Sequence, residues 1–178
     1  MVSSIPRRIC ASDGRPPVVV LTDAYLSDNC DEAGIGAVML NEKGEATGYI
    51  SEEVPGDVLK IIQAETKHVI TALEVLPVYF VRVAWNTEMV HRRCFIFVDN
   101  DGARHSLLRC TSGSQSVLRV LRKVVFLQAK WPCFAWYSRV PSPANIADDP
   151  SRGKITDLME SGVSRHNVDS RTWREALS

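Results

Sequence analysis

Short apolar runs separated by turn residues divide most of the chain into strands and helices. Residues 17–26 are apolar on both faces, which is typical of a strand in the middle of a sheet. Two further strands are predicted at 33–41 and 45–51, and the short polar turns between them favour an antiparallel meander. Apolar runs at 94–99 and 133–139 predict a fourth and a fifth strand.

Apolar residues spaced three and four apart predict helices between the later strands. In the pattern over residues 59–76, Glu65 falls on the apolar face, and Pro77 is expected to end or kink the helix. Further helices are predicted at residues 101–109, 114–130 and after Asn145. The order β-β-β-α-β-α-β-α predicts an α/β fold with a mixed sheet and helices on its faces.

Length and charge favour one domain without a strong global attraction to nucleic acid. The 178 residues are expected to comprise an N-terminal tail at 1–16, a single domain at 17–160 and a polar C-terminal tail at 161–178. Lys+Arg and Asp+Glu both number 21, so the formal net charge is zero. This balance argues against strong sequence-independent binding to nucleic acid but leaves room for a local basic face.

The cysteines and apolar runs indicate a soluble intracellular protein. Five scattered cysteines without a Cys-x-x-Cys motif argue against a disulfide framework or a zinc site. The N-terminus lacks an apolar signal core, and Arg82 interrupts the longest candidate membrane span. We therefore expect the cytoplasm or the nucleus, with no membrane association and no small organic cofactor.

Four acidic residues close apolar stretches where a charge is costly: Asp23, Glu65, Asp99 and Asp148. Burying a carboxylate without compensation is strongly unfavourable, so such groups pair with cations or shift their pKa. If the strands at 17–26 and 94–99 are neighbours, Asp23 and Asp99 lie side by side. Four converging carboxylates predict a site for Mg²⁺, and two such ions are suited to cleaving a phosphodiester.

Several segments together resemble the ribonuclease H domains of retroelement reverse transcriptases, of the retrotransposon and pararetrovirus type. Thr22-Asp23-Ala24 with Gly34-Ile35-Gly36 is similar to their first hairpin, and Phe97-Val98-Asp99-Asn100 to their fourth strand. Ala64-Glu65 with Ala72-Leu73 is similar to their first helix. Asn145 to Arg152 matches the closing Asn-x-Ala-Asp-x-x-Ser-Arg pattern. The resemblance covers roughly residues 17–153.

The resemblance implies a ribonuclease H-like fold and a metal-dependent nuclease. The fold would be a five-stranded mixed sheet in the order 3-2-1-4-5 with helices on both faces. The activity would be endonucleolytic hydrolysis of the RNA strand of RNA–DNA hybrids with two Mg²⁺ ions, for which Mn²⁺ can substitute. Asp23 would bridge the ions, Glu65 and Asp99 would hold the ion on the side of the attacking water, and Asp148 would complete the other. A reverse transcriptase domain would be a further partner.

Two departures from the family pattern leave an alternative open. The loop 139–144 has no His, although many members carry one before the last acid, and Tyr25 replaces a small residue after the first Asp. The alternative is a catalytically weak or inactive ribonuclease H-like module that binds nucleic acid or has a structural role in a retroelement protein. Asp149 is also an alternative to Asp148 as the ligand.

Basic and polar residues near the predicted site are candidates for nucleic-acid binding. They are Asn100, Arg152 and Lys154 beside the acids, and Arg119, Arg122 and Lys123 along the helix at 114–130. A solvated helix face is the competing interpretation for the last three. A proofreading exonuclease would need Asp-x-Glu on the first strand and an integrase would need its Glu last, so other nucleases on this fold fit less well.

Overall fold

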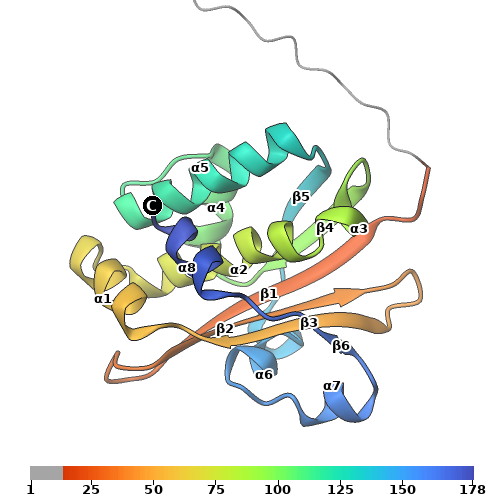
Figure 1. The fold of residues 1–178 in the computed structure, drawn as a ribbon, viewed down its shortest axis with the longest axis horizontal. Helices are drawn as coiled ribbons and strands as arrows, with labels where there is room; N and C mark the ends of the chain where they lie inside the picture. Colours follow the sequence, from red (N-terminus) through yellow and green to blue (C-terminus); the bar gives the residue numbers. More distant parts are fainter. Residues whose placement is uncertain (1–13) are drawn as a thin grey trace, which may run out of the picture.

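A computed structural model describes residues 14–178, so residues 1–13 of the predicted N-terminal tail lie outside the described part (Figure 1). Its centre is a single six-stranded sheet in the order β5-β4-β1-β2-β3-β6. The strands are β1 (Val18–Leu26), β2 (Ala33–Leu40), β3 (Ala46–Glu53), β4 (Arg93–Val98), β5 (Phe134–Arg139) and β6 (Ser164–Arg165). All five predicted strands are present, and the α/β class is confirmed.

The sheet is mixed, as the order of elements predicts. β1, β2 and β3 form an antiparallel meander, while β4 and β5 run parallel to β1. The expected total of five strands was wrong, because the short strand β6 adds to the outer edge of β3. Arg165 holds this edge by donating from Nη2 to the carbonyl of Ser51 at 2.8 Å.

The helices differ from the prediction mainly between residues 59 and 84. Thr66 adopts an extended backbone, so the predicted helix is divided into two, and the second continues through Pro77. The helices are α1 (Gly56–Glu65), α2 (Val69–Ala84), α3 (Asn86–Met89), α4 (Asp101–Arg109), α5 (Gln115–Lys130), α6 (Asp148–Ser151), α7 (Thr156–Glu160) and α8 (Ser170–Ala176), with a 3-10 turn at Ser142–Ala144.

Helices cover both faces of the sheet (Figure 1). On one face α2 packs directly on β1 and against α5, and every residue from Ala72 to Arg82 is buried. A helix that is apolar nearly all round belongs in the interior of a domain. On the other face lie the short helices α6 and α7. Among the helices of residues 14–178, none combines the length and apolar character needed to cross a membrane.

The C-terminal segment packs on the domain. Residues 161–178 were expected to form a polar tail, but they contain β6 and α8. Trp173 of α8 is buried and meets the ring of Phe80 edge-on, with centroids 4.6 Å apart. This apolar contact ties the end of the chain to α2.

Candidate metal centre

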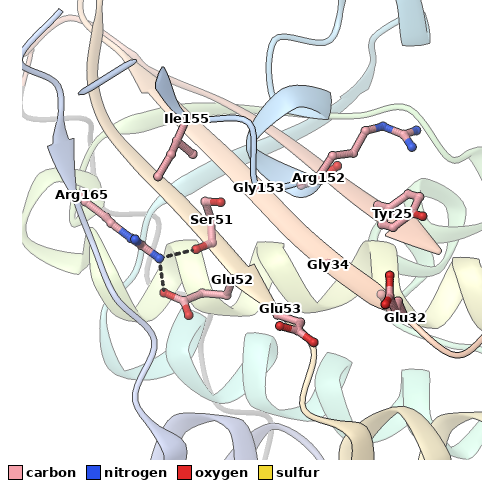
Figure 2. Close-up of a pocket in the computed structure, with 12 residues that line it drawn as sticks. Tyr25, Glu32, Gly34, Ser51, Glu52, Glu53, Arg152, Gly153, Ile155 and Arg165 are labelled. Carbon is pink, nitrogen blue, oxygen red and sulfur yellow. Dashed lines mark hydrogen bonds and ion pairs between the residues drawn. The ribbon is translucent and has the colours of Figure 1, made fainter. Parts of the chain in front are cut away.

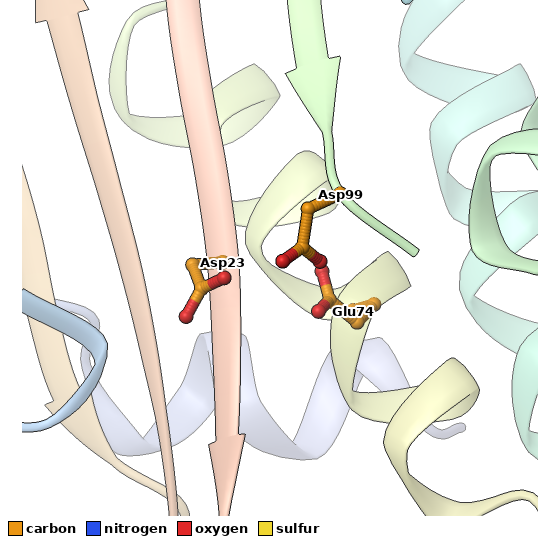
Figure 3. A group of neighbouring side chains, drawn as sticks. All are labelled: Asp23, Glu74 and Asp99. Atoms are coloured by element: carbon orange, nitrogen blue, oxygen red, sulfur yellow. The ribbon is translucent and has the colours of Figure 1, made fainter. Parts of the chain in front are cut away.

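Three carboxylates from three elements meet at one end of the sheet. The parallel register pairs Thr22 of β1 with Val98 of β4, so Asp23 and Asp99 come next on neighbouring strands. Glu74 reaches them from α2, which crosses the sheet at this point (Figure 3). One carboxylate oxygen of each residue lies within 4.8 Å of the other two.

Burial and like charge make this cluster unfavourable without a cation. Asp23 and Glu74 are each only 3% exposed, and Asp99 is half-buried. Desolvation is the largest cause that raises the pKa of Asp23 to about 6, and the charges of Asp99 and Asp148 add to it. Desolvation, followed by the charges of Asp23 and Asp99, raises the pKa of Glu74 to about 10. A metal-free centre therefore retains a proton on Glu74 at neutral pH.

The cluster has the properties of a hard-cation site. Oε2 of Glu74 is buried and has no hydrogen-bond partner in the described structure. Among residues 14–178, no Lys or Arg forms an ion pair with Asp23, Glu74 or Asp99. Because Mg²⁺ and Mn²⁺ bind carboxylate oxygens, a divalent ion would neutralise these charges and engage the orphaned oxygen. The residues present thus fit a divalent metal.

Asp23 is fixed in place by the segment that leads into α6. The side-chain amide of Asn145 donates to Oδ1 of Asp23 at 3.0 Å and to the carbonyl of Thr22 at 3.0 Å. The hydroxyl of Ser151 lies 2.6 Å from Oδ2 of Asp23. Both donors are buried, so the carboxylate has little freedom to rotate.

Two glycines of β2 allow α6 to approach the sheet. Gly36 pairs with Asp23 in the β1–β2 register. A Cβ atom on Gly36 would collide with the backbone of Ala147 and Ser151, and one on Gly34 would collide with the carbonyl of Ser151. The missing side chains therefore make room for the α6 backbone beside the metal centre.

The fourth predicted acid, Asp148, begins α6 at the border of this centre. The hydroxyl of Ser151 lies 2.6 Å from Oδ2 of Asp23 and 2.7 Å from the carbonyl oxygen of Asp148, so the two residues are near each other, and the charge of Asp148 adds to the raised pKa of Asp23. Unlike Asp23, Glu74 and Asp99 in the described residues 14–178, Asp148 has a cationic partner, because Nε of Arg152 donates to its Oδ1 at 3.0 Å and to its Oδ2 at 3.1 Å. Asp149 instead lies 3.8 Å from Nζ of Lys154.

The structure places Glu65 away from the acids it was expected to join. Glu65 ends α1 and forms an ion pair with Nη1 of Arg119 at 2.6 Å, and it also accepts a hydrogen bond from Ser116. These contacts hold the pKa of Glu65 below its usual value, with the Ser116 hydrogen bond the largest cause. The extended backbone at Thr66 separates α1 from α2, so Glu65 and the apolar face of α2 do not belong to one continuous helix, and Glu74 occupies the place expected for Glu65. The sequence did contain a signal for Glu74, because it is a lone carboxylate within the strongly apolar stretch that forms α2.

The predicted nucleic-acid-binding residues fall into two groups. Asn100, Arg152 and Lys154 lie near the centre, and Asn100 also caps α4 by accepting from the amide of Ala103 at 2.9 Å. On α5, Arg119 is engaged by Glu65, while Arg122 and Lys123 line a hollow between α2, α5 and α8. The α5 cations therefore do not face the carboxylate cluster as one group.

Two surface hollows lie on the domain, one beside α6 and the other beside Glu65. A cavity of about 420 Å³ lies where β2, β3 and the end of α6 meet, and its lining includes Tyr25, Ser151 and Arg152 (Figure 2). A groove of about 640 Å³ runs between the α1–α2 junction, α4 and the start of α5. Its polar lining includes Glu65, Thr66, Lys67, His68, Thr71, Ser112 and Ser114.

Solved structures match this chain in fold. No protein-family model and no curated protein sequence matches the chain. LC11-RNase H1, isolated from compost by a metagenomic approach, superimposes with a TM-score of 0.58 at 15% identity, covering 82% of this chain and 99% of its own. The fold is that of ribonuclease H.

Two further solved structures agree with this fold. The N-terminal RNase H domain of rv2228c from Mycobacterium tuberculosis gives a TM-score of 0.57 at 14% identity, covering 84% of this chain and all of the domain. LC11-RNase H1 in complex with an RNA/DNA hybrid gives 0.54 at 16% identity, covering 80% of this chain and 99% of its own. These structures share the ribonuclease H-like fold that was expected from the sequence.

Proposed function

We propose that this protein is a metal-dependent endoribonuclease that cleaves the RNA strand of RNA–DNA hybrids. The main support for this proposal is the cluster of Asp23, Glu74 and Asp99 on a ribonuclease H fold. Within it, a buried oxygen of Glu74 has no hydrogen-bond partner in the described structure. A ribonuclease H1 of the same fold has been solved with an RNA/DNA hybrid, which supports this class of substrate.

The carboxylates divide into those that would hold one ion and those that would border a second. Asp23, Glu74 and Asp99 would hold the first, while Asp148, with Asp23, would serve the second. When bound, such ions activate water for attack and neutralise charge on the scissile phosphate. Mg²⁺ is the expected ion and Mn²⁺ the expected substitute.

The surrounding residues orient the carboxylates and receive the substrate. Asn145 and Ser151 hold both oxygens of Asp23, so its direction is fixed before the substrate arrives. Asn100 follows Asp99 in the chain, and Lys154 pairs with Asp149, the neighbour of Asp148. The polar groove between the α1–α2 junction, α4 and the start of α5 can follow a phosphate backbone. Because the net charge is zero, affinity for the hybrid depends on these local groups. We therefore expect this affinity to fall only slightly as the salt concentration rises.

The closing motif supports a retroelement setting. Asn145, Ala147, Asp148, Ser151 and Arg152 match the pattern of retrotransposon and pararetroviral ribonuclease H domains. In that setting a reverse transcriptase domain would be the partner, and the cytoplasm or nucleus the place of action.

One observation favours a second candidate, a module that binds hybrids without efficient cleavage. The loop 139–144, which leads from β5 to the 3-10 turn before α6, contains no His. A His there would provide a group for proton transfer, so its absence favours slow turnover.

A cleavage assay separates the two functions. A labelled RNA–DNA hybrid is incubated with the protein and Mg²⁺ or Mn²⁺, with double-stranded RNA and double-stranded DNA as matched substrates. We expect cleavage of the hybrid's RNA strand alone, abolition by a chelator, and loss in Asp99→Asn. Hybrid binding without cleavage in either ion would support the second candidate, and cleavage that survives Asp99→Asn would contradict the proposed site.

A further inference from the structure

We propose that Arg152 is a built-in counter-ion for Asp148, which it holds until a metal ion displaces it. This inference rests on the proposed function, because it concerns the second metal position of the same centre. It assigns Arg152 as a positioning residue that controls how tightly that position binds metal.

The geometry singles out Arg152 among the basic residues near the site. Its Nε lies 3.0 and 3.1 Å from the two oxygens of Asp148, which is four residues earlier. Both oxygens are therefore engaged by one cation. Asp23, Glu74 and Asp99 have no such partner among residues 14–178, so Asp148 is the one acid of the four proposed ligands that is already neutralised.

Tyr25 also contacts the guanidinium of Arg152. The central carbon of the Arg152 guanidinium lies 4.6 Å from the centroid of the Tyr25 ring, within the range of a cation–π contact. Tyr25 follows Asp23 by two positions on β1, so both side chains emerge on the same face of the strand. Figure 2 shows Arg152 extending toward Tyr25 at the rim of the cavity. The bulky residue that departs from the family pattern thus has a specific contact.

Exposure makes the ion pair exchangeable. The side chains of Arg152 and Asp148 are 40% and 41% exposed, and ion pairs at this exposure are weak. A divalent ion can therefore displace the guanidinium. A phosphate of the hybrid also competes for Arg152, since guanidinium groups bind phosphate in the same planar geometry as carboxylate. Binding of hybrid would then free Asp148 and favour metal at the second position.

Titration calorimetry with Mn²⁺, without nucleic acid, tests this inference. Arg152→Gln should tighten the weaker Mn²⁺ site by about threefold to fivefold, because a competing charge is removed. The same substitution in an Asp148→Asn background should give a clearly smaller gain, because only the longer-range effect of Arg152 on Asp23 remains. Tyr25→Phe, which keeps the ring, should resemble the wild type, whereas Tyr25→Ala should shift affinity in the direction of Arg152→Gln.

Lys154→Ala is the charge-matched control, because Lys154 is two residues away but faces Asp149. It should leave Mn²⁺ affinity unchanged. Two results would overturn the inference and leave the proposed function standing. One is an equal gain of Mn²⁺ affinity in Lys154→Ala. The other is an unchanged or lower Mn²⁺ affinity in Arg152→Gln while the wild type binds Mn²⁺. A wild-type protein that binds no Mn²⁺ would overturn both.

Discussion

At the scale of single residues, the centre is defined by which carboxylate oxygens have partners. The two oxygens of Asp23 accept hydrogen bonds from Asn145 and Ser151, whereas Oε2 of Glu74 has none. Asp23 is therefore held rigidly, whereas Glu74 offers an oxygen whose lone pairs are free to bind a metal. This difference gives the two buried acids separate roles in one centre.

Ser151→Ala tests the support of Asp23. The substitution removes a hydrogen bond that lowers the pKa of Asp23, so that pKa should rise further. We expect metal affinity to fall about tenfold, as for other groups that orient a ligand. The unfolding free energy should fall by roughly 1–2 kcal/mol. Calorimetric Mn²⁺ titration and denaturant unfolding measure the two effects.

Ser116→Ala is the matched control for this experiment. Ser116 is also buried and also donates to a carboxylate, that of Glu65, away from the centre. The Ser116→Ala protein should have a lower unfolding free energy than the wild type, with the same metal affinity. Equal metal affinity in Ser151→Ala and wild type would contradict the role assigned to Ser151.

The residues also show where prediction from sequence succeeds. Asp23 and Asp99 were found because each closes an apolar run, and the parallel pairing of β1 with β4 brings the two positions side by side. Glu74 was missed because the helical pattern was assumed to continue without interruption from 59 to 76. The helix stops at Thr66, whose Oγ1 accepts from the amide of His68 at 3.0 Å, and α2 begins separately at Val69.

At the scale of elements, the centre depends on how closely α6 docks on β2 and β3. Gly34 and Gly36 remove the side chains that would separate them, and the hydroxyl of Ser51 donates to the carbonyl of Pro150 at 2.7 Å. α6 has only four residues and cannot be stable alone. Its position, and thus that of Asp148 and Ser151, is set by the strands beneath it.

Gly36→Ala should disrupt this docking. The added Cβ would collide with backbone atoms of Ala147 and Ser151, which cannot move aside like a flexible side chain. We expect a loss of about 3 kcal/mol or more in unfolding free energy, with a marked loss of metal affinity. Gly113→Ala is the control, since its Cβ would meet no atom within 4 Å. Similar unfolding midpoints for the two variants would show that the close approach is unimportant.

The elements also mark a limit of prediction from the sequence. The five main strands follow from apolar runs and turn residues, but β6 has only two residues and both are exposed. No hydrophobic pattern can reveal such a strand, because its backbone contacts to β3 and the burial of Trp173 arise only in the folded molecule.

At the scale of the whole molecule, zero net charge conceals a local excess of negative charge. The centre concentrates three carboxylates, two of them buried, without a paired cation in the described residues. The folded protein therefore raises the pKa of Asp23 from 3.8 to about 6 and that of Glu74 from 4.5 to about 10. An acid whose pKa is raised by folding favours the folded state only while it can remain protonated.

The stability of the metal-free protein should therefore fall as the pH rises. Above about pH 5 the unfolded chain has released the protons that Asp23 and Glu74 still bind when folded, so unfolding becomes easier with each pH unit. Thermal unfolding with a chelator should give a lower midpoint at about pH 8 than at about pH 5.5, and Mg²⁺ should raise the midpoint more at the higher pH. In Glu74→Gln this pH dependence should be weaker. A midpoint that rises with pH in the chelated protein would contradict the electrostatic account.

The most direct test of the central claim compares Glu74→Gln with Glu65→Gln in the hybrid cleavage assay. Both remove one carboxylate from neighbouring helices, but only Glu74 lies beside Asp23 and Asp99. With folding verified by circular dichroism, we predict that Glu74→Gln loses roughly 100-fold or more of the Mg²⁺-dependent rate, and that Glu65→Gln stays within about twofold of wild type. A Glu74→Gln protein that cleaves at the wild-type rate, or a Glu65→Gln protein that is inactive while folded, would contradict the account.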